Sequence, residues 1–191
     1  MEMDLEKLVF DWVKSNPERV DVKSEHYCQT RDVFQARLDK MVKNLLQSGN
    51  ISEGNVYIIS AMAGEIGNNS FDHNLGNWPD VVGIFFGYEI TDGKLKIILA
   101  DRGRGIQATL KKVKPEIEND KDALRVAFTE RISGRFPERR GNGLKFVREN
   151  VEEKKMHLTF ISGNAKIELN AEMKIEEAEE NVRGCLAILT M

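Results

Sequence analysis

The sequence has few of the residues that would indicate a disulfide-linked, metal-stapled or membrane-spanning protein. Only Cys28 and Cys185 are cysteines, and neither has a Cys or His nearby at metal-binding spacing. No apolar run approaches the roughly 18–20 residues of a membrane-spanning helix. The N-terminus is acidic and lacks the basic start of a secretory signal peptide. These absences predict a reduced, soluble, cytoplasmic protein that does not associate with a membrane.

An excess of positive charge is also absent. Lys and Arg number 28 against 31 Asp and Glu, which gives a net charge of −3. The basic footprint that nucleic-acid binding requires is therefore missing, and no nucleic-acid partner is expected. What remains is ordinary for a globular chain: 191 residues, 41% hydrophobic and 31% charged, enough for one domain with its own core.

The hydrophobic pattern predicts helices and strands in a definite order. Helices are expected over residues 3–14, 31–50, from Ser52 into 64–74, and 144–151; residues 18–28 fit a strand or irregular chain. Strands are expected as a hairpin around Thr91–Gly93, from 81–90 and 94–100, and over 156–163, 165–173 and 182–191. Residues 106–140 read as a long polar excursion, and 176–181 as an acidic, solvated loop. This order predicts an α+β fold with helices covering one face of a sheet.

The stretch "GEIGNNSFDHN" (64–74) places many polar groups on one helix. At about 100° per residue, Glu65, Asn69 and Asp72 fall on one shoulder of the apolar stripe that contains Ile66, whereas Asn68 points away from it. A side chain at that shoulder can be half-buried and still face a cleft. Two interpretations remain open at this point: a solvated helix flank, or a row of ligand-binding groups.

The stretch "ILADRGRGI" (98–106) runs from a strand directly into a glycine-rich turn. Asp101 ends the strand, and Gly103 and Gly105 follow it. A carboxylate at this place is a fixed acceptor, and glycine backbone beside it allows a planar ligand to approach closely. Such an acceptor suits an exocyclic amine such as that of adenine. An ordinary turn is the alternative.

The stretch "RRGNGLKFVREN" (139–150) is a glycine-rich turn that opens a helix. Gly141 and Gly143 leave room for backbone to wrap a ligand, and the free N–H groups of a helix start favour phosphate. Arg139 and Arg140 stand beside them, in a ten-residue segment with four arginines and one glutamate. This pattern indicates an anion site, although glycine before a helix is common.

In this order, the three stretches resemble the N, G1 and G2 boxes of the GHKL (histidine kinase-like) ATP-binding superfamily, over roughly residues 52–191. The resemblance implies the Bergerat fold, a two-layer α/β sandwich with a mixed, mostly antiparallel sheet and ATP on its helical side. It also implies a mobile lid, for which residues 106–140 are the candidate. Residues 1–50 would be an N-terminal helical extension and 51–191 the ATP-binding domain.

The resemblance also implies roles for individual residues. Glu65 would be the catalytic residue that orients or deprotonates the attacking group, Asn69 a ligand of Mg²⁺, and Asp101 the acceptor for the adenine amine. The remaining cofactor-binding positions are Asp72, His73, Gly103, Gly105, Ile106, Arg139, Arg140, Gly141, Asn142, Gly143, Leu144 and Cys185. Cys185 departs from the family, which often has a threonine there, and a thiol is the weaker hydrogen-bonding group.

Two functions follow from the resemblance. In the first, the chain is a Mg-ATP-dependent kinase or ATPase that acts in regulation through a partner protein, in a layout closest to the stand-alone anti-sigma-factor-like serine kinases. In the second, it is a nucleotide-gated binding module, in which ATP only orders the lid and creates a surface for the partner. Residues 1–50 are the candidate surface for that partner or for a second copy of the chain.

Overall fold

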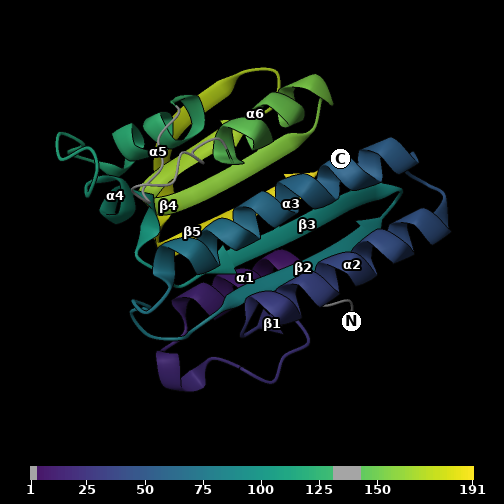
Figure 1. Cartoon of the computed structure of the whole chain (residues 1–191), viewed down its shortest axis with the longest axis horizontal. Helices are drawn as coiled ribbons and strands as arrows, with labels where there is room; N and C mark the ends of the chain where they lie inside the picture. The colour runs from purple at the N-terminus through teal and green to yellow at the C-terminus, as the bar shows by residue number, and fades with distance from the viewer. Residues whose placement is uncertain (1–3, 131–142) are drawn as a thin grey trace.

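One antiparallel sheet organises the computed structural model, which describes residues 4–130 and 143–191 (Figure 1). Its strand order is β1-β2-β3-β5-β4. The strands are β1 (Tyr27–Cys28), β2 (Ile84–Thr91), β3 (Lys94–Asp101), β4 (His157–Leu169) and β5 (Met173–Thr190). β2 and β3 form the predicted hairpin, with Asp92 and Gly93 both at positive φ in the turn. The predicted α+β class, with a mostly antiparallel sheet under helices, is confirmed.

Four helices cover one face of this sheet: α2 (Arg31–Ser48), α3 (Glu53–Asn74), α5 (Asp120–Thr129) and α6 (Gly143–Glu153). The sequence begins and ends α2 with strong local signals. The Thr30 side chain accepts a hydrogen bond from the Val33 N–H, and Gly49 closes the helix in the left-handed conformation. The apolar stripe predicted for α3 packs inward, since Ile59, Met62, Ala63 and Ile66 are all buried. The core therefore lies between these helices and the sheet.

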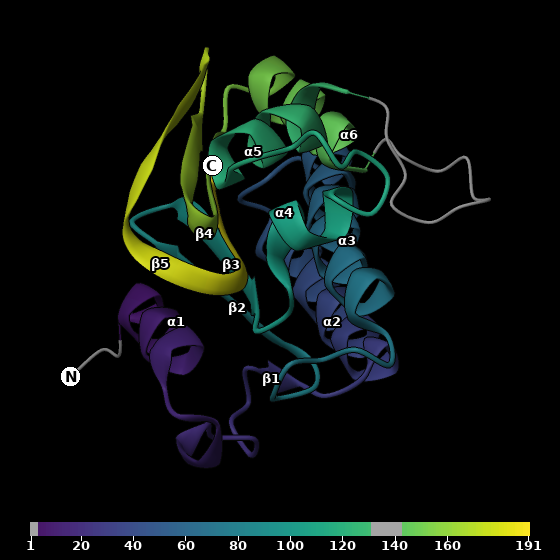
Figure 2. The ribbon, with the colours of Figure 1, turned by 90° about the vertical axis from the view of Figure 1, so that its left-hand side faces the viewer.

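The opposite face of the sheet is covered in part by α1 (Leu5–Lys14), as Figure 2 shows. The buried residues of α1 pack against apolar side chains of β2, β3 and β5, among them Phe85, Ile98 and Leu186. Along β3, Ile97 and Leu99 face the larger core and Ile98 and Ala100 face α1. Residues 1–50 thus add helices to both faces, and their assignment as a separate extension stays a prediction.

The last part of the chain differs from the prediction of three strands and an acidic loop. β4 and β5 are two long strands, and Glu176 to Asn181 belong to β5. Their pairing shifts register around Gly163, so β4 bends there without breaking. The acidic residues are accommodated because lysines lie opposite or near them, as in the Lys166–Glu176 and Lys121–Glu177 ion pairs.

The polar segment 106–140 also contains more regular structure than expected. Its described part holds all of α4 (Gly105–Leu110) except the first residue, and the whole of α5. These two helices enclose a small apolar cluster that includes Leu110, Ile117 and Val126. Whether this segment acts as a lid stays a prediction, and its residues 131–140 lie outside the described part. In the part of the chain that the structure describes, none of the helices combines the length and apolar character needed to cross a membrane.

Candidate functional site

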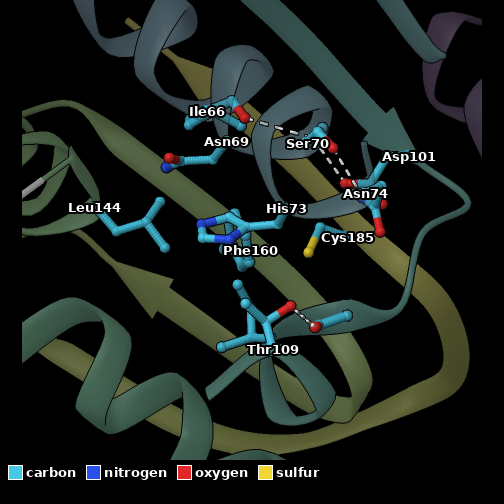
Figure 3. A pocket seen from close by; sticks show the side chains of 12 residues that line it. Ile66, Asn69, Ser70, His73, Asn74, Asp101, Thr109, Leu144, Phe160 and Cys185 are labelled. Carbon is cyan, nitrogen blue, oxygen red and sulfur yellow. Dashed lines mark hydrogen bonds between the residues drawn. The ribbon is translucent and has the colours of Figure 1, made fainter. Parts of the chain in front are cut away.

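A pocket opens between the C-terminal half of α3 and the ends of β3 and β5 (Figure 3). Its cavity volume is about 50 Å³, so a ligand larger than a ring system would extend out of it. The lining comes from six elements: Ile66, Asn69, Ser70, His73 and Asn74 of α3, Asp101 of β3, Gly105, Ile106 and Thr109 of α4, Leu144 of α6, Phe160 of β4 and Cys185 of β5. Seven of these twelve were predicted from the sequence as binding residues.

Asp101 provides the polar floor of the pocket and is 2% exposed. Its Oδ2 accepts a hydrogen bond of 2.7 Å from the Ser70 hydroxyl, and its Oδ1 accepts one of 2.7 Å from the Gly103 N–H. Burial raises the pKa of this carboxyl, against the effect of its hydrogen bonds from Ser70, Gly103 and Cys185. Among residues 4–130 and 143–191, no lysine or arginine forms an ion pair with it. Asp101 is therefore a fixed acceptor that a ligand donor could satisfy.

β5 approaches Asp101 closely because residue 184 is glycine. Gly184 has φ +81°, and a Cβ there would lie 2.2 Å from the Asp101 backbone oxygen. Ser162 of β4 ties this region together, since its hydroxyl donates to the Gly184 carbonyl and accepts from the Ile106 N–H. Cys185 follows, and burial together with the nearby Asp101 holds the pKa of its thiol well above the usual value. Cys185 is thus a neutral thiol at the floor of the pocket.

Glu65 and Asn69 meet the start of α6 at the mouth of the pocket. A Cβ on Gly143 would lie 2.5 Å from Glu65 Oε2 and 3.3 Å from Asn69 Nδ2, so the start of α6 lies directly against both side chains. Asn69 lines the pocket, whereas Glu65 is exposed and stands outside the lining. The structure thus brings together the shoulder of α3 and the glycine-started helix, which are separated by more than seventy residues in the sequence.

Other predicted residues lie elsewhere. Asp72 lies outside the pocket lining and forms an ion pair with Arg31 at the start of α2. Gly103 does not line the pocket either but supports Asp101 from behind. Asn68, expected to point away from the shoulder, is half-buried, and its Oδ1 is shielded with no hydrogen-bond partner in the described part. Four predicted residues lie outside the described ranges: Arg139, Arg140, Gly141 and Asn142.

The described residues offer few metal ligands. They contain no cluster of three or more His, Cys, Asp or Glu side chains that could hold a metal ion. The Asn69 side chain makes no hydrogen bond to a described residue, and its amide oxygen is a hard donor of the kind Mg²⁺ accepts. A single protein oxygen fits Mg²⁺ only if phosphates and waters complete its coordination. The donor set therefore fits a metal that arrives with a phosphate ligand.

The sequence prediction missed several pocket residues. Thr109 and Phe160 line the cavity from elements that carried no recognised motif. Ser70 stood inside the quoted stretch 64–74, and its spacing of one helical turn from Ile66 placed it on the inner side of α3. Asn74, one turn further, was expected to support the site, but its hydrogen bonds were not predicted. That spacing was the available signal, because a polar residue on the core side of a helix must find a partner.

The likeness of this chain to known proteins is structural and distant. No family model matches the sequence, and no curated protein is detectably similar to it. Among solved structures, the chain is similar to the 43K ATPase domain of Thermus thermophilus gyrase B, solved in complex with an aminocoumarin. The identity is 18%, the TM-score is 0.39, and the match covers 81% of this chain. The chain spans 40% of the length of that structure, and no residue role is transferred from it.

Proposed function

We propose that the pocket binds the adenine base of Mg-ATP, and that the chain is a GHKL-type ATPase or protein kinase. In this proposal it acts in regulation, through a partner protein that either carries the phospho-acceptor or responds to the nucleotide state. Adenine would lie on the floor formed by Asp101, with Gly105, Ile106 and Cys185 around it. The phosphates would extend past Asn69 toward the start of α6.

The observation that carries this proposal is the buried carboxylate of Asp101. Isolated buried charge is costly, and such a group normally has a cationic partner. Asp101 instead has neutral donors, Ser70, Gly103 and Cys185, and faces a cavity whose lining includes the apolar side chains of Ile106, Leu144 and Phe160. A ligand with an N–H donor on a flat apolar ring would donate to Asp101 and pack against the apolar part of the lining. Adenine, with its exocyclic amine, is such a ligand.

The phosphate side of the proposal depends on α6 and Asn69. The free N–H groups at the start of α6 favour anions, and Gly143 keeps the backbone close to Glu65 and Asn69. The Asn69 oxygen would hold Mg²⁺, and a bound Mg²⁺ would neutralise charge on the phosphates. Arg139, Arg140, Gly141 and Asn142 complete the phosphate site in this proposal, on the strength of the sequence resemblance alone.

Glu65 is the proposed general base. Its carboxylate lies against Gly143, beside the mouth of the pocket, where the phosphate end of the ligand would emerge. From there it would orient or deprotonate the attacking water or hydroxyl. A hydroxyl from a partner protein could reach this place because Glu65 is exposed.

The same exposure favours a second candidate, a nucleotide-gated binding module with little or no turnover. No hydrogen bond to another described residue fixes the Glu65 carboxylate in one orientation toward a reacting atom. In this alternative, nucleotide binding changes the surface near α4 and α6, and a partner recognises that surface. The fate of the bound nucleotide separates the two candidates.

Titration of the full chain with two Mg-nucleotides tests the proposal. One is ATP, and the other is purine riboside triphosphate, which is the same molecule without the exocyclic amine. We expect ATP to bind about tenfold or more tightly, since the deaminated analogue leaves the buried Asp101 acceptor unsatisfied. Equal affinities would reject the adenine assignment, and failure of both to bind would reject the function.

A further inference from the structure

Asn74, the last residue of α3, is a buried polar side chain that the proposed function does not use. It is 4% exposed, and both ends of its amide are engaged. Nδ2 donates a hydrogen bond of 2.8 Å to the Ser70 carbonyl, one turn earlier on the same helix. Oδ1 accepts a hydrogen bond of 3.0 Å from the backbone N–H of Arg104, thirty residues later in the chain. Asn74 therefore links α3 to the turn that follows β3. Figure 3 shows its side chain beside Asp101.

Asn74 also determines what residue 103 can be. A Cβ on Gly103 would lie 2.1 Å from Asn74 Nδ2 and 2.4 Å from its Cγ and Oδ1. The three atoms nearest to that Cβ all belong to the Asn74 amide. The amide of Asn74 therefore packs flat against the Gly103 backbone, and the N–H of Gly103 donates to Asp101 Oδ1.

These contacts close a ring of hydrogen bonds around Asp101. Ser70 donates through its hydroxyl to Oδ2, Gly103 donates to Oδ1, and Asn74 connects the Ser70 carbonyl with the Arg104 N–H. Both carboxylate oxygens are therefore fixed from opposite sides. A fixed acceptor loses little conformational entropy when a ligand binds, and this raises affinity.

We propose that Asn74 is a positioning residue for base recognition, which holds the Gly103–Arg104 turn so that the Asp101 carboxylate faces the ligand amine. The inference rests on the proposed function of Asp101. Asn74 acts here through Gly103 and Arg104, because its Oδ1 accepts from the Arg104 N–H, one Nδ2–H donates to the Ser70 carbonyl, and its amide packs against Gly103. Removing it orphans the Arg104 N–H and frees the Gly103 peptide to rotate.

The first test compares Asn74→Ala with the parent, using Mg-ATP and Mg-purine riboside triphosphate on the full chain. We expect ATP affinity to fall about tenfold, while affinity for the analogue without the amine stays within about twofold. A purely structural role would lower both affinities by the same factor, because it would disturb the whole pocket. Asn77→Ala is the matched control, since the exposed Asn77 side chain accepts from the Arg104 guanidinium and donates to the Leu75 carbonyl but does not bond the Arg104 backbone. It should leave both affinities at the parental values.

The second test uses two double variants. Because Asn74 acts through Asp101, Asn74→Ala should cost nothing further for ATP in an Asp101→Asn background. Gly103→Ala alone should weaken ATP binding strongly, since its Cβ collides with the Asn74 amide. In the Asn74→Ala background that collision is absent, so Gly103→Ala should bind ATP as well as Asn74→Ala alone.

The outcomes separate the two proposals. If the parent prefers ATP over the deaminated analogue and Asn74→Ala keeps the full preference, the positioning role is wrong and the adenine site stands. Additive losses in the Asp101→Asn background would also overturn the positioning role. If the parent shows no preference between the ligands, the adenine assignment fails first, and the role of Asn74 in base recognition fails with it.

Discussion

At the scale of single residues, the proposed recognition of the adenine amine depends on Asp101. Asp101→Asn keeps the shape, since the new amide can accept from Gly103 and donate to the Ser70 hydroxyl, which can turn to accept. The variant presents an N–H where the ligand amine needs an acceptor. We expect ATP affinity to fall about ten- to a hundredfold, as for loss of a hydrogen bond to a charged group. Calorimetry measures it, and Asp92→Asn, in the exposed β2–β3 turn, is the control.

The buried carboxyl of Asp101 should also leave a signature in the pH dependence of stability. Burial raises its pKa above the ordinary 3.8, so the native state holds this proton more tightly than the unfolded chain does. Between 3.8 and the raised pKa, the free energy of unfolding should therefore fall as pH rises. Above the raised pKa the penalty is constant. Urea unfolding of the parent at a series of pH values should show this fall, and Asp101→Asn should lack it. Parallel curves for the two proteins would contradict the assignment.

Glu65 and Asn69 have different tasks in the proposed function, although they lie on the same shoulder of α3. Glu65→Gln should leave Mg-ATP affinity nearly unchanged and lower turnover or phosphotransfer by about 10²–10⁴-fold, the usual cost of losing a general base. Asn69→Ala should weaken Mg²⁺-dependent nucleotide binding and turnover together. Calorimetry and phosphate-release assays measure the pair. Parental turnover in Glu65→Gln would favour the nucleotide-gated binding module.

The residues of the site differ in how well the sequence reveals them. Asp101, Gly105 and Gly143 can be recognised from their immediate neighbours in the sequence, because an acceptor at a strand end and a glycine before a helix are local patterns. The roles of Ser70 and Asn74 depend on hydrogen bonds with residues about thirty positions later in the chain. The linear sequence does not show that these residues lie side by side. Pairing of polar groups across the core depends on the assembled fold. For that reason, the acceptor was predictable and the groups that hold it were not.

At the scale of elements, the contact between α2 and α3 requires glycine at one position only. A Cβ on Gly67 would lie 2.3 Å from the ring of Phe34, which is fully buried against Phe71 and Phe86. Gly67→Ala should therefore lower the free energy of unfolding by about 1–3 kcal/mol, as overpacking does. Chemical denaturation measures this loss.

Gly64→Ala is the control for that prediction. Three residues earlier on the same helix, its Cβ would meet Leu38 at an ordinary 3.6 Å. Alanine has the higher helix propensity by about 1 kcal/mol, so this variant should be as stable as the parent or more stable. A loss in Gly64→Ala equal to that in Gly67→Ala would show that glycine matters here for another reason.

The strands show where local patterns mislead. The β2–β3 hairpin was predictable because Thr91-Asp92-Gly93 is a strong turn signal between apolar runs. The break expected near Gly163 was wrong, because a β-bulge lets one strand continue past a glycine. The loop predicted for the acidic run 176–181 was also wrong. Its partners on β4 and α5, including Lys166 and Lys121, are distant in sequence, so the local pattern does not show that they offset its charge.

At the scale of the whole molecule, Arg102 fastens α1 to the sheet. Its guanidinium donates to the backbone oxygens of Trp12, Val13 and Ser15 and to the carboxylate of Asp80. Arg102→Met removes the side-chain donor of the Trp12, Val13 and Ser15 carbonyls and the buried cation beside Asp80. We expect a loss of about 3–5 kcal/mol in the free energy of unfolding, as when one partner of a buried ion pair is removed. Denaturant unfolding measures it.

Arg183 provides the matched control for Arg102. It donates to the same Asp80 carboxylate at 3.1 Å, but its side chain is 58% exposed. Arg183→Met should therefore cost less than about 1 kcal/mol, as for exposed ion pairs. Similar losses for Arg102→Met and Arg183→Met would show that burial of the guanidinium is not what stabilises the attachment of α1.

The cover of the sheet on both faces was only partly predictable. The run Ile97–Ala100 is apolar without alternation, which is the pattern of a strand buried on two sides. That pattern indicates a second cover but not its identity. The choice of α1 depends on Arg102, whose partners lie about ninety residues away along the chain. Long-range polar attachments of this kind are invisible in a single sequence.

Asp101 and Arg102 are neighbours in the chain, yet their side chains serve opposite faces of the sheet. A scan of all substitutions, scored only by nucleotide binding in cells, would therefore mark residues 101–103 as one intolerant block. The causes would differ, because loss at position 101 removes a ligand contact and loss at 102 lowers the amount of folded protein. Scoring the same library by protein abundance would divide the block, with position 102 depleted and Asp101→Asn retained.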